Sequence, residues 1–168
     1  MEDSIKNRVA ESALMTFNLE DYYPEGIRSS IDIAPWLYQG ILLKETEFRQ
    51  ALKEFDGSMY QDHYVALHCS SDAILPAWAF LLVSTYLQPY ARKILIGTLE
   101  ELDTLLMNEA LDKIDLEAYR DGLVIIKGCS KKPVPKNAYL LIAQKLQPIV
   151  KKLMYGEACS SVPLYKKP

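Results

Sequence analysis

A stretch of 22 residues occurs twice in the second half of the chain, 59 positions apart. Residues 76–97 read PAWAFLLVSTYLQPYARKILIG, and residues 135–156 read PKNAYLLIAQKLQPIVKKLMYG. Nine aligned positions are identical without a gap, and most of the others exchange similar side chains. One inserted residue upstream brings Cys69-Ser70 onto Cys129-Ser130. The pattern indicates an internal duplication, so the fold must accommodate the same structural unit twice.

Each copy has the sequence features of a strand, a helix and a second strand. An apolar run, 64–68 or 123–127, predicts a buried strand and is followed by a turn that contains Cys-Ser. Helical spacing of apolar residues follows, and Gln-Pro ends it because proline removes a hydrogen-bond donor. A short apolar run then leads to glycine. So few residues between two strands require a parallel pair with a right-handed crossover.

The chain as a whole is expected to form an α/β fold, a three-layer sandwich with a mostly parallel sheet. A length of 168 residues fits one domain. A further strand is expected over 27–33 and a helix over 99–111, which Thr98 and Glu101 would begin with a capping box. The predicted organisation is a single domain over 1–168, with an amino-terminal arm over 1–26 and internal repeats over 64–97 and 123–156.

Composition and charge exclude several classes of protein. The chain has 19 basic and 22 acidic residues and a net charge of −3, which argues against a protein that coats nucleic acid or a membrane surface. Asp3, Lys6 and Arg8 interrupt any apolar run at the amino terminus, so no secretion signal is expected. A cytoplasmic location follows, where cysteines remain thiols. The apolar residues of the arm need burial, which predicts packing across the domain or oligomer formation.

The three cysteines, Cys69, Cys129 and Cys159, all follow predicted strands. Ligands of parallel α/β sheets bind at the carboxyl ends of the strands, so these thiols are expected to share one edge. Three converging thiolates would form a soft ligand set for zinc, iron or an iron–sulfur cluster. The fourth or a supporting position would be taken by one of three nearby polar residues: Asp72, Glu157 or His68.

Two other functions remain open on the same residues. Cysteine is among the most often buried residues, and no Cys-x-x-Cys pair is present, so the chain could be an interaction module with structural core cysteines. It could also be a small-molecule enzyme with Cys69 as nucleophile. In that hypothesis a helix from Ala73, capped by Asp72, would lower the pKa of the thiol. No histidine base is evident for such a reaction.

Several segments resemble an uncharacterised bacterial family, the domain of unknown function numbered 2480. They are FNLEDYYPEG, CSSDAILPAWAFLL, VIIKGC with the following PVP, and MYGEACSSVPLYKK. The resemblance extends over essentially the whole chain, including all three cysteines. It carries no established activity. It implies a connection with iron–sulfur cluster assembly, with assembly proteins as partners, and so favours a thiol site that handles metal or sulfur.

Overall fold

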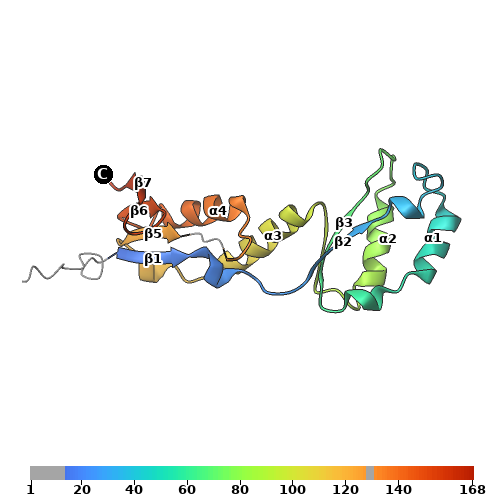
Figure 1. Ribbon diagram of the computed structural model, residues 1–168, viewed down its shortest axis with the longest axis horizontal. Coiled ribbons are helices and arrows are strands. Elements are labelled where there is room, and N and C mark those ends of the chain that lie inside the picture. The colour runs from blue at the N-terminus through green and yellow to red at the C-terminus, as the bar shows by residue number, and fades with distance from the viewer. Residues whose placement is uncertain (1–13, 128–130) are drawn as a thin grey trace, which may run out of the picture. The chain divides into compact units, whose positions relative to one another are not determined.

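The computed structural model describes residues 14–127 and 131–168 (Figure 1). The chain divides into two compact units. The first, here called the middle unit, spans 25–103, and the second, the terminal unit, combines the described residues of 1–24 with 104–168. Each unit has its own sheet and its own apolar core. The single-domain organisation stays a prediction.

The middle unit is built on a three-stranded parallel sheet in the order β2-β3-β4. Its helices connect consecutive parallel strands, as such pairs require. Its strands and helices are β2 Arg28–Asp32, the 3-10 turn Ala34–Trp36, α1 Glu45–Glu54, the 3-10 turn Gly57–Tyr60, β3 Tyr64–His68, α2 Trp78–Leu87 and β4 Lys93–Ile96.

The core of the middle unit lies between its sheet and the helices α1 and α2. Val65 and Leu67 project from β3 and are fully buried, together with Phe48 of α1 and Val83 of α2. Alternate residues of a strand face the same side of a sheet, so Val65 and Leu67 both lie on the face that the helices cover. The run YVALH is buried on both faces of the sheet except at His68, as expected of a central parallel strand.

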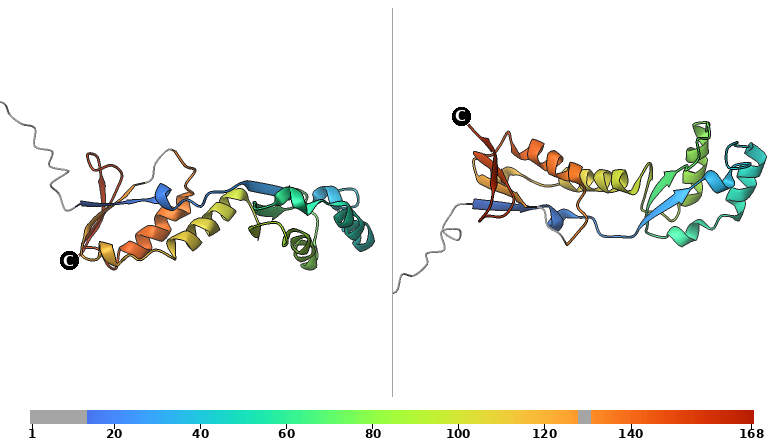
Figure 2. Two further views of the ribbon diagram at one scale, coloured as in Figure 1. Left: turned by 90° about the horizontal axis from the view of Figure 1, so that it is seen from below. Right: turned by 45° about the horizontal axis from the view of Figure 1, so that its top comes forward.

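The terminal unit has a four-stranded sheet in the order β1-β5-β6-β7, parallel except for β7, which runs antiparallel to β6. Helix α4 and the second half of α3 run beside this sheet (Figure 2) and contribute to its core. Its elements are β1 Leu14–Asn18, the 3-10 turn Leu19–Tyr22, α3 Leu99–Leu111, which begins in the middle unit, the 3-10 turn Glu117–Tyr119, β5 Leu123–Lys127, α4 Lys136–Leu146, β6 Lys152–Tyr155 and β7 Val162–Lys166.

The structure confirms the α/β class and the mostly parallel pairing, with the strands distributed over two sheets. Both repeats contain a parallel strand pair joined by a helix, and 152–155 is the strand that the repeat predicts. The capping box is also confirmed, since the backbone N–H of Thr98 donates to the Glu101 carboxylate at 2.7 Å. Within the described residues, no helix combines the length and the apolar character needed to cross a membrane.

Two local predictions are wrong. The helix of the first repeat begins at Trp78 and not at Ala73, and Asp72 is exposed and does not cap it. Pro76 explains the difference, because the residue before a proline is disfavoured in helical conformation.

Residues 14–18 of the predicted arm form strand β1, paired in parallel with β5. Of the arm's apolar residues, Ile5 and Val9 lie outside the described residues.

Phe17 of β1 is fully buried in the terminal core, stacked on Tyr22 with ring centroids 4.9 Å apart. We expect Phe17→Ala to lower the free energy of unfolding by about 3–5 kcal/mol, the usual cost of deleting a buried ring. The neighbouring Thr16 is exposed on the other face, so Thr16→Ala should change it by less than about 0.5 kcal/mol. Urea denaturation of both variants measures the difference. Equal, small effects would show that β1 adds little to the core.

Candidate functional site

Cys69 follows β3 directly, at the carboxyl end of the middle sheet. Its side chain is half-buried and packs against the edge of the middle core. The sulfur lies 3.2 Å from the hydroxyl oxygen of Ser71, within hydrogen-bond distance. Cys69 is therefore a free thiol with a polar neighbour, at the edge where parallel sheets bind ligands.

Asp32, the last residue of β2, holds the turn that contains Cys69. Its carboxylate accepts hydrogen bonds from the backbone N–H of Ser70 at 3.0 Å and from the Ser70 hydroxyl at 2.5 Å. It also accepts the N–H of Ala34 at 3.0 Å. The Ser70 hydroxyl, followed by the Ala34 N–H, holds the pKa of Asp32 below its usual value. The turn after Cys69 is thus fixed by charge-assisted bonds from the neighbouring strand.

The terminal unit has a matching acid after its first strand. Glu20 is 7% exposed and is the one buried charged residue among those described. Its carboxylate accepts the backbone N–H of Lys131 at 2.8 Å and that of Lys132 at 2.9 Å. These two residues follow the Cys-Ser pair of the second repeat in the sequence. In each unit, an acid at or just after the end of the first strand therefore holds the chain that follows the central strand.

Cys159 is exposed in the turn after β6, at the corresponding edge of the terminal sheet. The turn is closed by a hydrogen bond from the N–H of Ser160 to the carbonyl of Glu157 at 3.0 Å. The carboxylate of Glu157 lies 3.2 Å from the ammonium of Lys127, the last residue of β5. Glu157 is thus paired with a cation at this edge.

The structure leaves the three-thiol site untested. Cys129 lies outside the described residues, and Cys69 and Cys159 belong to different units. In 14–127 and 131–168, no three His, Cys, Asp or Glu side chains gather where they could hold a metal ion. His68 is half-buried at the end of β3, opposite Asp32 in the parallel register. Its charge lowers the pKa of Asp32 by a minor amount compared with the hydrogen bonds. The shared metal site stays a prediction.

Sequence reasoning missed Asp32 and Glu20, although a local signal was present. Asp32 is the last residue of β2 and precedes a 3-10 turn, whereas Glu20 lies within the 3-10 turn that follows β1. Aspartate in that position commonly accepts the N–H two residues later, as Asp32 does from Ala34. No local signal predicts that the Glu20 carboxylate accepts the backbone N–H of Lys131, because the two residues are 111 positions apart.

The family model described as Protein of unknown function (DUF2480) matches residues 3–167. The chain belongs to this family. A match over this range includes both units, both repeats and all three cysteines. Neither the curated proteins nor the solved structures contain a match to the chain. Membership therefore assigns no activity, and the functional argument depends on the geometry of the two sheet edges.

The bonds of Asp32 predict how stability responds to pH. Its folded pKa is lowered, so its stabilisation is present above the unfolded value, about 3.9, and is lost as the pH falls through the folded value. We expect Asp32→Ala to unfold at lower urea concentration than wild type at pH 7, with the gap shrinking below about pH 4. Asp72 is an exposed acid in the loop that Asp32 holds. Asp72→Ala is therefore the control and should show no such gap. A gap independent of pH would contradict this role of the carboxylate.

Proposed function

We propose that the protein is an accessory protein that holds zinc, iron or an iron–sulfur cluster through Cys69, Cys129 and Cys159. One observation carries the proposal: the chain after the central strand is held from the same side by an acid in both units. Asp32 bonds Ser70 beside Cys69, and Glu20 bonds Lys131 beyond Cys129 in the sequence. A binding site benefits from loops fixed before the ligand arrives.

The two described cysteines support a chemical role for the thiols. Cys159 is exposed and Cys69 is half-buried, and both are free. A structural core cysteine is ordinarily fully buried. Thiolate sulfur favours zinc, copper(I) and iron–sulfur groups over hard cations such as magnesium. The proposal places the chain in a reducing compartment, where these thiols stay available, and iron–sulfur assembly proteins are the partners it implies.

An interaction module is the second candidate, and a separate observation favours it. Strand β4 ends the middle sheet with an open apolar edge, which is a common site of protein association. This candidate requires no metal. A Cys69 nucleophile is the third candidate, but the group within hydrogen-bond distance of the sulfur in the described residues is the Ser71 hydroxyl, which is not a base.

Metal content separates the three functions. Untagged protein purified without oxygen is expected to retain metal at about one site per chain, because three thiolates bind soft metals tightly. Cys69→Ser, Cys129→Ser and Cys159→Ser should each reduce the retained metal roughly ten-fold or more. Ser160→Ala, adjacent to Cys159 in the same exposed turn, is the matched control and should retain it. Elemental analysis and absorbance spectra measure the content, and thermal melts show that each variant is folded.

Thiol labelling of the metal-free chain distinguishes the outcomes. If wild type holds no metal and all cysteines react at ordinary rates, the interaction module replaces the metal site. If one thiol reacts much faster than the others and Cys69→Ser removes that reaction, the nucleophile hypothesis replaces it. Retention of metal by all three serine variants would also overturn the proposed ligand set.

A further inference from the structure

Strand β4 is one of the two edge strands of the middle sheet, and β2 is the other. The inner side of β4 pairs with β3, and no strand in the described parts of the chain pairs with its outer side. The sequence of the strand is Lys-Ile-Leu-Ile, and Ile96 is 58% exposed. An open apolar edge presents backbone donors and acceptors for pairing with another strand, unless charges or a proline protect it. Beyond Lys93, β4 has no such protection.

The second repeat shows what occupies the equivalent edge. Strand β6 matches β4 in the duplication, and its outer side pairs with the antiparallel strand β7. Leu153 and Met154 of β6 are 2% and 7% exposed. Their equivalents in β4, Ile94 and Leu95, are only half-buried. The same sequence unit thus has a covered edge in one half of the chain and an uncovered edge in the other.

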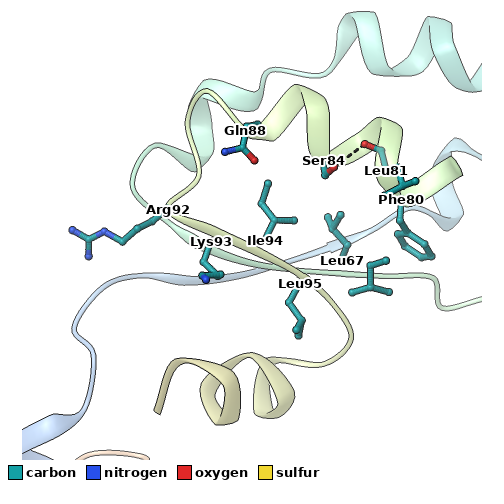
Figure 3. A pocket seen from close by; sticks show the side chains of 10 residues that line it. Leu67, Phe80, Leu81, Ser84, Gln88, Arg92, Lys93, Ile94 and Leu95 are labelled. Carbon is teal, nitrogen blue, oxygen red and sulfur yellow. Dashed lines mark hydrogen bonds between the residues drawn. The ribbon is translucent and has the colours of Figure 1, made fainter. Parts of the chain in front are cut away.

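A groove of about 590 Å³ lies between β4 and the outer face of α2 (Figure 3). Ile94 points into it from the strand toward the helix, and Leu95 points to the opposite side. Leu81 of α2 lines the groove and is 62% exposed, but its equivalent Leu140 in α4 is equally exposed. The two repeats therefore differ in whether a strand covers the outer edge of β4 or β6, and not in the exposure of the helix α2 or α4. The missing component is a strand.

We propose that β4 pairs in antiparallel fashion with β4 of a second copy of this chain, joining two three-stranded sheets into one of six. The pairing is centred on Leu95, so Ile94 lies opposite Ile96 of the second copy and Lys93 lies opposite its Gly97. Opposite residues of antiparallel strands point to the same face. This register therefore places both α2 helices on one side of the joined sheet and merges the two grooves.

Charge favours a second copy in this orientation. The chain is basic at the start of β4, with Arg92 and Lys93, and acidic after it, where Glu100 and Glu101 lie in the first turn of α3. Antiparallel self-pairing brings the basic end of one strand near the acidic end of the other. The carboxylate of Glu101 lies against Gly97, in the space that a side chain there would take, so the proposed pairing brings this acid near Lys93 of the second copy. Two-fold pairing also closes the assembly at β4, because both copies use the same edge and no β4 edge remains to add a third copy.

The full-length chain tests the proposal by its mass as a function of concentration. Sedimentation should give twice the monomer mass of 19.1 kDa at high concentration. Ile96→Lys places a charge on the exposed edge and should raise the dissociation constant roughly ten-fold or more. The control is Ile74→Lys, the same change at an isoleucine that is 97% exposed in the loop before α2. It should leave the dissociation constant unchanged.

A cross-link tests the register without depending on the folding of Ile96→Lys. In the proposed pairing, Leu95 of one chain lies opposite Leu95 of the second copy. Their Cα atoms are about 4.5–5.5 Å apart, a separation that a disulfide can bridge. Leu95→Cys should therefore form a covalent dimer on mild oxidation, whereas wild type and Ile74→Cys should not. A monomer at all concentrations overturns the proposal. So does a dimer that Ile96→Lys leaves intact while Leu95→Cys fails to cross-link.

Discussion

The central strand of each sheet, β3 or β5, is the constraint on which the rest of the structure depends. Val65, Ala66 and Leu67 of β3 are fully buried, and Val124, Ile125 and Ile126 of β5 are at most 1% exposed. A strand buried on both faces needs paired neighbours and helical cover, because its backbone groups cannot reach water. Parallel neighbours bring the carboxyl ends of the strands to one edge. The loops that follow the strands are therefore neighbours by necessity.

At that edge, the backbone N–H groups of the loops need acceptors, and an acid from the adjoining chain supplies them in both units. Asp32 does so with a carboxylate that also accepts a serine hydroxyl. Glu20 does so from a buried position with two successive backbone N–H groups. The two acids differ in residue type and in distance from the strand. Asp32 bonds the residue directly after Cys69, and Glu20 bonds the second and third residues after Cys129 in the sequence. In both units, a carboxylate thus fixes described backbone N–H groups of the loop that follows the central strand.

The outer edges of the repeats differ, although their sequences are alike. In the terminal unit, Tyr165 of β7 lies opposite Leu153 and packs against the core, so the edge of β6 is closed. Pro163 is compatible with β7 because that strand has a free outer side in the described residues and can lose one donor. In the middle unit, the chain turns into α3 after β4 and supplies no such strand. The two repeats share the strand–helix–strand unit but not the strand that covers its outer edge.

The sequence by itself determined the features that depend on neighbouring residues. The repeat placed both strand–helix–strand units, and the Thr98–Glu101 spacing gave the start of α3, because periodicity and capping involve residues within a few positions. The tertiary structure decided which distant segments pair. Strand β1 pairs with β5, more than 100 positions later, and the Glu20 carboxylate accepts a hydrogen bond from the backbone N–H of Lys131. A strand of five residues has little local preference of its own, so its partner, and with it the covering of each sheet edge, is fixed only when the chain is folded.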